Sequence, residues 1–223
     1  MSKADLHIDW ATHKAAKYAC ENWHYSGCVP VGKLVKVGVW ENGKFIGVVL
    51  FGRGASPQLG KPYGLGQDEC VELVRIALTS HKNAVSRISA LSIKFLQKAN
   101  PKIRLIVSFA DSLQGHHGGI YQAGNWLYSG IGTAKPRLVL TDGTTRHNRL
   151  YQGKNKQAIP KGALWSASTG KHRYLMPLDK AMKDQIQSIS KPYPKRATKA
   201  NSEDHSESGG AVPTGTLQSK EAV

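Results

Sequence analysis

The sequence predicts an α/β (α+β) fold, with a mixed central sheet flanked by helices. Residues 33–53 contain two strand-like runs on either side of Asn42-Gly43, and Asn-Gly between β-branched runs is the strongest short hairpin signal. A helical pattern over 80–100 lies between two further strand-like runs, 70–78 and 104–109. A long helix between two strands allows them to lie parallel, so the predicted sheet is mixed.

The elements follow one another with clear boundaries. The first is a helix over 9–22, in which Trp10, His13, Ala16 and Lys17 occur at helical spacing. After the hairpin, a Gly/Pro-rich loop over 54–67 leads into the strand 70–78. The helix over 80–100 has Ala84, Ile88, Leu91 and Phe95 on one side, Ser80 and Asn83 as cap-forming residues, and Asn100-Pro101 at its end. After the strand 104–109, a short helix over 116–123 and a strand over 126–132 complete the order.

One domain and a tail account for the 223 residues. Composition shifts near Lys191, where Lys-Pro-Tyr-Pro-Lys-Arg runs into a Ser/Glu/Gly-rich stretch with few large apolar residues. Such a stretch cannot bury enough apolar surface to offset its ordering entropy. We therefore expect a folded domain over 1–190 and a disordered tail over 191–223.

The positive charge belongs to the predicted domain. The chain has 31 Lys and Arg against 15 Asp and Glu, a net charge of +16, and the tail contributes five bases and four acids, which leaves +15 for 1–190. A domain this basic predicts a polyanionic partner, because Lys and Arg contacts to phosphates release counterions. A nucleic acid is the expected partner, and a solvated basic face is the alternative.

Membrane and secretory classes are disfavoured. No apolar run approaches the roughly 20 residues that span a bilayer, and the N-terminus lacks a signal-peptide pattern, so we expect no membrane partner and a cytoplasmic location. The cysteines Cys20, Cys28 and Cys70 form no C-x-x-C pair, so they are expected to be small buried hydrophobic residues rather than metal ligands.

Two segments are candidates for binding a phosphate group. The loop 54–61 resembles a Walker phosphate loop but has the wrong glycine spacing and Pro62 in place of Ser or Thr, so it is rejected. The turn before the helix 80–100 is a better candidate, because a helix N-terminus presents free N–H groups to an anion. Its candidate cofactor-binding residues are Thr79, Ser80, Lys82, Asn83 and Arg87.

Two polar stretches are candidates for catalysis. Asp111 ends a buried strand, and Tyr121 follows a glycine-rich loop that contains His116-His117. Asp111 could act as a general base or a metal ligand, and Tyr121 could act as an acid. The alternative is structural: Asp111 caps the next helix, and the glycines only form a turn. The second stretch, Trp23-His24-Tyr25-Ser26, has aromatic rings that can stack on an unpaired base.

Basic side chains interleave with aromatic ones over 135–175, as is typical of nucleic-acid surfaces. The candidate DNA-binding residues of the whole chain are Arg53, Arg75, Arg149, Lys154, Lys156, Lys161 and Arg173.

Several of these motifs together resemble the Mom family of bacteriophage DNA-modification proteins. They are Asn22-Trp23-His24-Tyr25-Ser26, the hairpin end Gly-Val-Val-Leu-Phe-Gly-Arg-Gly-Ala, Glu72–Leu78, Ser108–Asp111, Gly119–Trp126 and Lys171–Tyr174. They occur in the family's order over about residues 15–178, and the tail is not covered.

The resemblance implies a GNAT-like acyltransferase fold in a protein of the bacterial host cytoplasm. It also implies conversion of adenine in double-stranded DNA to its N6-carbamoylmethyl (acetamido) form, which protects phage DNA from host restriction endonucleases. His24, Tyr25, Asp111 and Tyr121 match the family's proposed active-site positions, and Arg75 matches a basic position near the substrate.

The resemblance implies an acyl-CoA donor and, as an option, bound iron. The sequence does not fix the oligomeric state, and a homodimer is one option. One departure concerns the donor: Thr79–Ala84 has no glycine, whereas acetyl-CoA users of the GNAT superfamily usually have a glycine-containing pyrophosphate loop there. Either acyl-CoA binds in a modified way, or the donor is another compound.

In the predicted mechanism an adenine leaves the base stack and is held by Tyr25 or Trp23. Asp111, assisted by His24, takes the N6 proton. Tyr121 then protonates or orients the leaving group. Two alternatives remain open. One is a His-metal DNA nuclease that uses His116-His117, Asn125 and His147-Asn148, and the other is a non-catalytic DNA-binding phage accessory protein.

Overall fold

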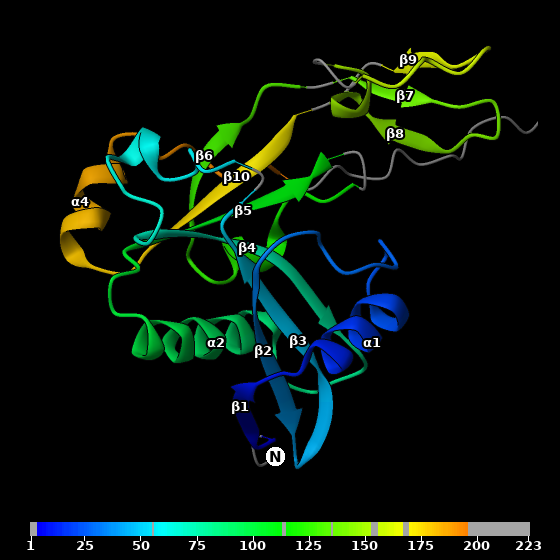
Figure 1. The fold of residues 1–223 in the computed structure, drawn as a ribbon. Coiled ribbons are helices and arrows are strands. Elements are labelled where there is room, and N and C mark those ends of the chain that lie inside the picture. Colours follow the sequence, from blue (N-terminus) through cyan, green and yellow to red (C-terminus); the bar gives the residue numbers. More distant parts are fainter. Residues whose placement is uncertain are drawn as a thin grey trace, which may run out of the picture.

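A seven-stranded mixed sheet forms the centre of the computed structural model (Figure 1). The structure describes residues 4–54, 56–112, 115–134, 136–152, 156–166 and 170–195, and only the backbone of 147–149. The strands are β1 (Leu6–Trp10), β2 (Leu34–Glu41), β3 (Lys44–Gly52), β4 (Cys70–Leu78), β5 (Leu105–Asp111), β6 (Leu127–Ile131), β7 (Arg137–Val139), β8 (Thr145–His147), β9 (Leu164–Ser166) and β10 (Lys171–Pro177). The helices are α1 (His13–Trp23), α2 (Val85–Ala99), α3 (Gly119–Gln122) and α4 (Lys180–Gln187), with short 3₁₀ turns η1 (Lys61–Tyr63) and η3 (Asn148–Tyr151).

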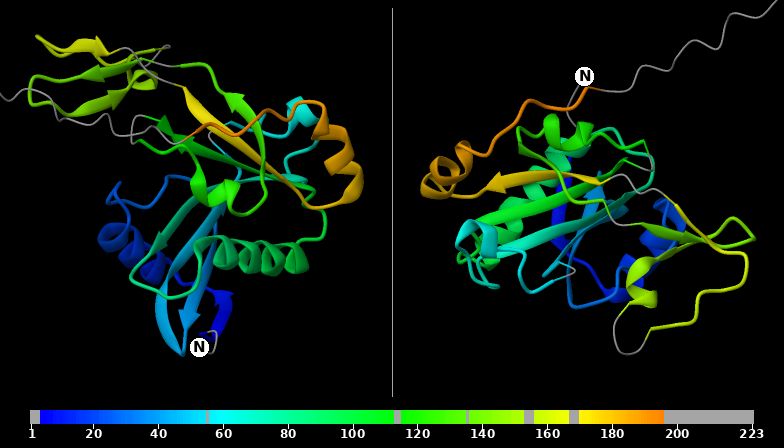
Figure 2. Two further views of the ribbon diagram at one scale, coloured as in Figure 1. Left: turned by 180° about the vertical axis from the view of Figure 1, so that it is seen from behind. Right: turned by 90° about the horizontal axis from the view of Figure 1, so that it is seen from above.

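The sheet order is β1-β2-β3-β4-β5-β10-β6, and β4–β5 is its parallel pair. The hairpin β2–β3 and the helix α2 between the parallel strands confirm the predicted mixed fold. The order helix, hairpin, strand, helix, strand is the one implied by a GNAT-like fold. A second sheet, β8-β7-β9, projects from the first as an arm, as Figure 2 shows from two further sides.

Alternation along β3 explains how helices cover both faces of the sheet. Val48 and Leu50 pack with Ala16 and Cys20 of α1, whereas Val49 and Phe51 lie in the cluster that contains Ile88 and Leu96 of α2. Successive side chains of a strand point to opposite faces, so one apolar run supplies two cores. A third cluster joins Met182 and Ile186 of α4 to Leu105 and Val107 of β5.

The predicted helix over 9–22 is wrong at its start. Residues Leu6–Trp10 form β1, which pairs antiparallel with β2 from Leu6↔Glu41 to Trp10↔Val37. The helix begins only after Thr12, whose side chain accepts a hydrogen bond from the Ala15 N–H at 3.1 Å. Pairing with the edge of β2 supplies backbone hydrogen bonds that a longer helix would have to form within itself, and helical spacing alone cannot show this.

Three smaller predictions also differ from the structure. The helix over 80–100 is observed as α2, but its N-cap is Ala84 and no side chain caps it, so Ser80 and Asn83 are not its caps. The predicted helix over 116–123 is reduced to the single turn α3. Cys20 and Cys70 are buried as expected, whereas Cys28 is exposed.

Described residues continue past the predicted domain boundary at 190 and contact the domain. The Lys191 N–H donates to the Tyr128 carbonyl at 2.7 Å, and the Tyr193 hydroxyl donates to the Trp126 carbonyl at 2.7 Å. Residues 191–195 therefore pack along β6, while the rest of the predicted tail, 196–223, lies outside the described residues. Within the described chain no helix is long and apolar enough to cross a membrane.

Gly118 and Gly115 provide a matched test of packing beside β10. Both have positive φ, +83° and +67°, but a Cβ on Gly118 would overlap the Tyr174 ring, whereas a Cβ on Gly115 would meet nothing within 4 Å. We expect Gly115→Ala to cost about 1 kcal/mol of unfolding free energy from backbone strain, and Gly118→Ala to cost a further ~1–3 kcal/mol from overpacking. Denaturant unfolding of both variants measures the difference, and equal losses would contradict the packing shown here.

Candidate active site

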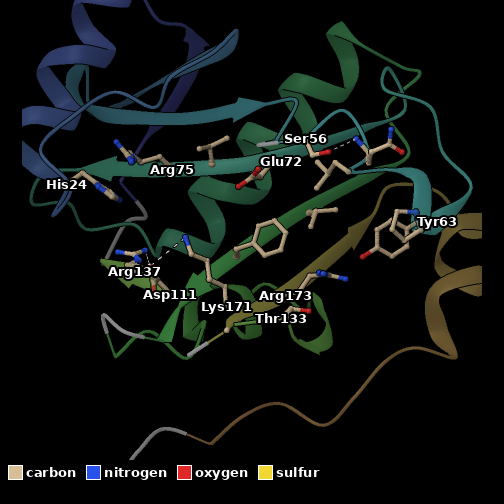
Figure 3. Close-up of a pocket in the computed structure, with 18 of the residues that line it drawn as sticks. His24, Ser56, Tyr63, Glu72, Arg75, Asp111, Thr133, Arg137, Lys171 and Arg173 are labelled. Atoms are coloured by element: carbon tan, nitrogen blue, oxygen red, sulfur yellow. Dashed lines mark hydrogen bonds and ion pairs between the residues drawn. The ribbon is translucent and has the colours of Figure 1, made fainter. Parts of the chain in front are cut away.

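A cleft opens where β4 and β5 part. The two strands pair only from Cys70↔Leu105 to Leu73↔Ser108, after which β4 continues beside β3 and β5 beside β10. The cleft has a volume of about 640 Å³. Figure 3 shows its charged side chains pointing into the gap from both strands and from β10. Its charged lining residues are Glu72, Arg75, Asp111, Arg137, Lys171 and Arg173, four cations against two carboxylates.

The apex of this fork is held by a buried chain of hydrogen bonds. The Ser108 hydroxyl lies 2.8 Å from the Leu73 carbonyl and 2.7 Å from the Tyr121 hydroxyl. A carbonyl can only accept, so Ser108 gives its single proton to Leu73 and Tyr121 donates to Ser108. Burial raises the pKa of Tyr121 to about 12. Tyr121 is not among the residues that line the cleft. Its hydroxyl proton is held in the hydrogen bond to Ser108.

Asp111 lies at the end of β5 and joins three elements. It is 7% exposed, and its carboxylate forms ion pairs with Arg137 of β7 at 3.2 Å and with Lys171 of β10 at 3.6 Å. Lys171 is also its cross-strand partner. A charged carboxylate this well buried needs such partners. Asp111 therefore fixes two cations at the wall of the cleft and ties the β7–β9 arm to the main sheet.

A β-bulge brings a second carboxylate into the cleft. Residues 72 and 75 are three apart and would point to opposite faces of a regular strand. The pairing of β3 with β4 shifts between Leu50↔Arg75 and Phe51↔Leu73, which leaves Val74 as the extra residue. Glu72 and Arg75 consequently both line the cleft. Glu72 is not among the residues predicted from the sequence, where its signal was one of two charged residues, with Arg75, in a mostly apolar strand.

Glu72 has the properties of a general base. Burial raises the pKa of its carboxyl above the ordinary 4.5, and nearby Lys171 offsets only part of this effect. Within the described part of the chain its carboxylate receives no hydrogen bond and forms no ion pair within 4.0 Å. A carboxylate with a raised pKa is a stronger base, and a perturbed acid in a cleft is a typical catalytic feature.

His24 is a neutral side chain in the wall of the cleft. Burial, with the positive charge of Arg75 and nearby His116, lowers its pKa to about 4. The Ser26 N–H lies 3.2 Å from its Nδ1. A backbone N–H can only donate, so Nδ1 accepts and Nε2 holds the proton of the neutral ring. His24 is thus suited to donate a hydrogen bond from Nε2 rather than to act as a proton acceptor.

Tyr25 forms an exposed aromatic rim beside it. Its side chain is 63% exposed, and its ring centroid lies 4.2 Å from that of His24 and 5.4 Å from that of His116. The loop after α1 and the loop after β5 therefore meet at this edge of the cleft. Rings exposed in this way can stack on a planar ligand.

The predicted cofactor-binding turn is filled from inside the protein. The Glu41 carboxylate accepts hydrogen bonds from the N–H groups of Lys82 and Asn83, both at 2.9 Å, and from the Asn83 side chain at 2.7 Å. These bonds lower the pKa of Glu41. Arg87 donates to the Asn83 side chain. None of Thr79, Ser80, Lys82, Asn83 and Arg87 lines the cleft, so this turn does not fit a cofactor pyrophosphate.

The candidate DNA-binding residues fall into two groups. Arg53 is exposed after β3, and Lys156 and Lys161 are exposed in the arm. Arg75 and Arg173 instead lie in the cleft: Arg75 donates to the Cys28 carbonyl, and the Arg173 guanidinium lies 5.8 Å from the centroid of the Phe109 ring. Lys154 and the side chain of Arg149 lie outside the described residues.

The geometry of the cleft does not match an iron site. No three His, Cys, Asp or Glu side chains come close enough to hold a metal ion in the part of the chain that the structure describes. Asp111 is ion-paired and the Tyr121 hydroxyl is directed at Ser108. The four residues matched by the resemblance therefore do not fit an iron centre in this arrangement.

The solved structures that align with the chain include two that are named as acetyltransferases. One from Bacillus subtilis in complex with CoA is 12% identical, and the alignment covers 79% of this chain and 100% of that chain with a TM-score of 0.44. Another, from Acinetobacter baylyi ADP1, is 12% identical and the alignment covers 80% and 95% of the two chains with a TM-score of 0.45. At these scores the alignments add no argument about chemistry or cofactor.

Sequence comparison gives a more specific result. The methylcarbamoylase mom of Escherichia phage Mu is 24% identical over 205 residues, which are 86% of this chain and 84% of that protein. The Mom protein family matches residues 5–195, from β1 through the segment packed on β6. The match includes both strands of the fork and every residue that lines the cleft, and the chain belongs to the Mom protein family.

Proposed function

We propose that the chain is a transferase that places a carbamoylmethyl (acetamido) group on N6 of adenine in double-stranded DNA, and so protects phage DNA from restriction endonucleases. The observation that carries the proposal is the cleft, whose lining includes the half-buried Glu72, four cations and the exposed ring of Tyr25. The similarity to a methylcarbamoylase supports the class of group, and the net charge of +16 supports a DNA substrate.

Access to N6 requires the adenine to leave the duplex, because its amine is otherwise paired and shielded. The rim formed by Tyr25, His24 and His116 offers a base a stacking surface at the mouth of the cleft. Base–aromatic stacking contributes about 1–3 kcal/mol per base, comparable to the few kcal/mol that unstacking costs. Tyr25 is therefore assigned to hold the flipped base.

Glu72 is assigned as the proton acceptor. The N6 lone pair is delocalised into the ring, so the amine needs to lose a proton as it reacts. As the N6–carbon bond forms, the bond from that carbon to the donor's leaving group breaks and its electron pair departs with the leaving group. The N6 proton passes to the Glu72 carboxylate. This assignment replaces the predicted use of Asp111 as the base.

The other side chains support this step. Lys171 and Arg137, fixed by Asp111, stabilise negative charge that develops on the leaving group. The Nε2–H of His24 is available as a hydrogen-bond donor toward the reacting groups. Asp111 acts through the two cations, and Tyr121 acts through Ser108 at the apex of the fork.

Glu72→Gln is expected to lower DNA modification at least about 100-fold while DNA affinity stays the same, because the amide keeps the shape but cannot accept the proton. The wild-type rate is expected to fall as pH decreases through the raised pKa of Glu72, since only the carboxylate is a base. Mass spectrometry of nucleosides from cells expressing each protein measures the product, and Glu21→Gln on the exposed side of α1 is the matched control.

Wild-type modification by Glu72→Gln would contradict the assignment. Unmodified nucleosides with the wild-type protein would contradict the proposed function itself. In that case metal-dependent cutting of plasmid DNA would support the nuclease, and its absence the non-catalytic DNA-binding protein.

Tyr121→Phe separates a positioning role from an acid role. Loss of the hydroxyl is expected to reduce the unfolding free energy by about 1 kcal/mol, because Ser108 loses its buried hydrogen-bond donor. Modification is expected to persist, since the phenol does not line the cleft. Abolished modification in a variant of unchanged stability would place the Tyr121 proton in the chemistry.

Lys156 and Lys161 test the arm as the phosphate-binding surface. Their joint replacement by Ala is expected to weaken binding to all duplex sequences and to reduce the slope of log K against log salt by up to about 2, roughly 0.9 per lost phosphate contact. Lys94→Ala with Lys98→Ala on the exposed side of α2 removes the same charge elsewhere. An equal change in both pairs, measured by fluorescence anisotropy across salt concentrations, would contradict a role for the arm.

A further inference from the structure

A second pocket adjoins the cleft on the far side of Tyr63 and Arg173. It has a volume of about 510 Å³ and is lined by Pro62, Tyr63, Ser129, Arg173, Ser188, Ile189, Ser190 and Lys191. Pro62, Tyr63 and Arg173 also line the cleft, so the two cavities meet at these residues. Figure 3 shows Arg173 extending from β10 toward Tyr63.

The second pocket has the chemistry of an anion site. Its lining includes two cations, Arg173 and Lys191, and three serine residues, but no carboxylate. The helix α4 ends at Gln187 beside it and contributes a partial negative charge of about half a unit, which the two full positive charges outweigh. Arginine and lysine with hydroxyl donors form a set that binds phosphate.

Both cations are held in place by the fold. The Arg173 guanidinium lies 5.8 Å from the centroid of the Phe109 ring, and its charge partly offsets the burial that raises the pKa of Tyr63. The Lys191 N–H donates to the Tyr128 carbonyl, which anchors this residue against β6. A Cβ on Gly130 would come within 3.1 Å of Lys191 Nζ, so the glycine leaves room for the lysine side chain on β6.

The usual place for a phosphate beside this cleft is already filled. The N–H groups of the turn before α2 bind the Glu41 carboxylate, and a second anion there would have to displace it. The pocket of Arg173 and Lys191 has no internal anion among its lining residues, and it adjoins the cleft directly.

We propose that the phosphate-bearing end of the group donor binds between Arg173 and Lys191, and that the donor extends past Tyr63 to present its reactive carbon in the cleft. The inference rests on the proposed function for the identity of the reaction. It assigns Lys191 and Arg173 to a small anionic ligand rather than to the DNA backbone.

Lys191→Gln tests the proposal, with Lys82→Gln for the filled turn and Lys98→Gln on α2 as a matched surface control. Inorganic pyrophosphate and coenzyme A, which both contain a diphosphate, are titrated calorimetrically into the full chain. Lys191→Gln is expected to raise the pyrophosphate Kd about tenfold or more, because a charge-assisted hydrogen bond is lost. The Lys82→Gln and Lys98→Gln variants are expected to bind as the wild type does.

Several results would overturn the proposal. They are no pyrophosphate binding by the wild type, a loss confined to Lys82→Gln, and equal losses in all three variants. Weaker binding of a short DNA duplex by Lys191→Gln, without an effect on pyrophosphate, would assign the pocket to the DNA backbone instead. Thermal unfolding of Lys191→Gln checks that the exposed substitution leaves the fold intact.

The coenzyme A titration identifies the kind of donor. Binding that is lost together with pyrophosphate in Lys191→Gln supports a coenzyme A donor, and pyrophosphate binding alone supports another phosphate-bearing carrier. Both readouts are independent of DNA modification. A protein that binds pyrophosphate through Lys191 but leaves nucleosides unmodified would therefore contradict the proposed function and not the anion site.

Discussion

The early parting of β4 and β5 is the constraint on which the rest of the site depends. Their parallel pairing ends at Leu73↔Ser108, although both strands continue. Antiparallel neighbours hold the outer edges, β3 as far as Gly47↔Leu78 and β10 as far as Lys171↔Asp111, so the two strands cannot close on each other. The Tyr121–Ser108–Leu73 hydrogen bonds fix the apex. In a continuous sheet a helix would cover the side chains at this place. Here they line a cleft instead.

The excess positive charge is divided between two environments. Exposed lysines of the arm, such as Lys156 and Lys161, remain in water and act at long range. The arginines at the cleft each have a local partner: the Asp111 carboxylate for Arg137, the Cys28 carbonyl for Arg75 and the Phe109 ring for Arg173. Removing a cation from water is costly without such partners, so their presence marks positions that the fold has fixed rather than a solvated basic face.

The Glu41 interaction shows that an internal carboxylate can satisfy the same groups that a ligand phosphate would. Lys82 and Asn83 precede Ala84, the N-cap of α2, so their N–H groups lie in the turn before the helix and need an acceptor from elsewhere. Here the acceptor comes from the end of β2, 41 residues before Lys82 in the chain. The β2–β3 hairpin places Glu41 at this turn, whose residues Thr79–Ala84 contain no glycine.

The sequence by itself determined the elements whose signals are local: the hairpin around Asn42-Gly43, the helix α2, the strands on either side of it and the basic character of the domain. Only the tertiary structure decided that Leu6–Trp10 is a strand, that Val74 is a bulge and that Glu72 faces the cleft. It also separated Tyr121 from the cleft and turned Arg173 inward. The spacing of apolar residues and the residue types of a turn depend on neighbours in the chain, so the sequence shows them directly. Strand register, bulges and buried ion pairs depend on partners that only folding brings together.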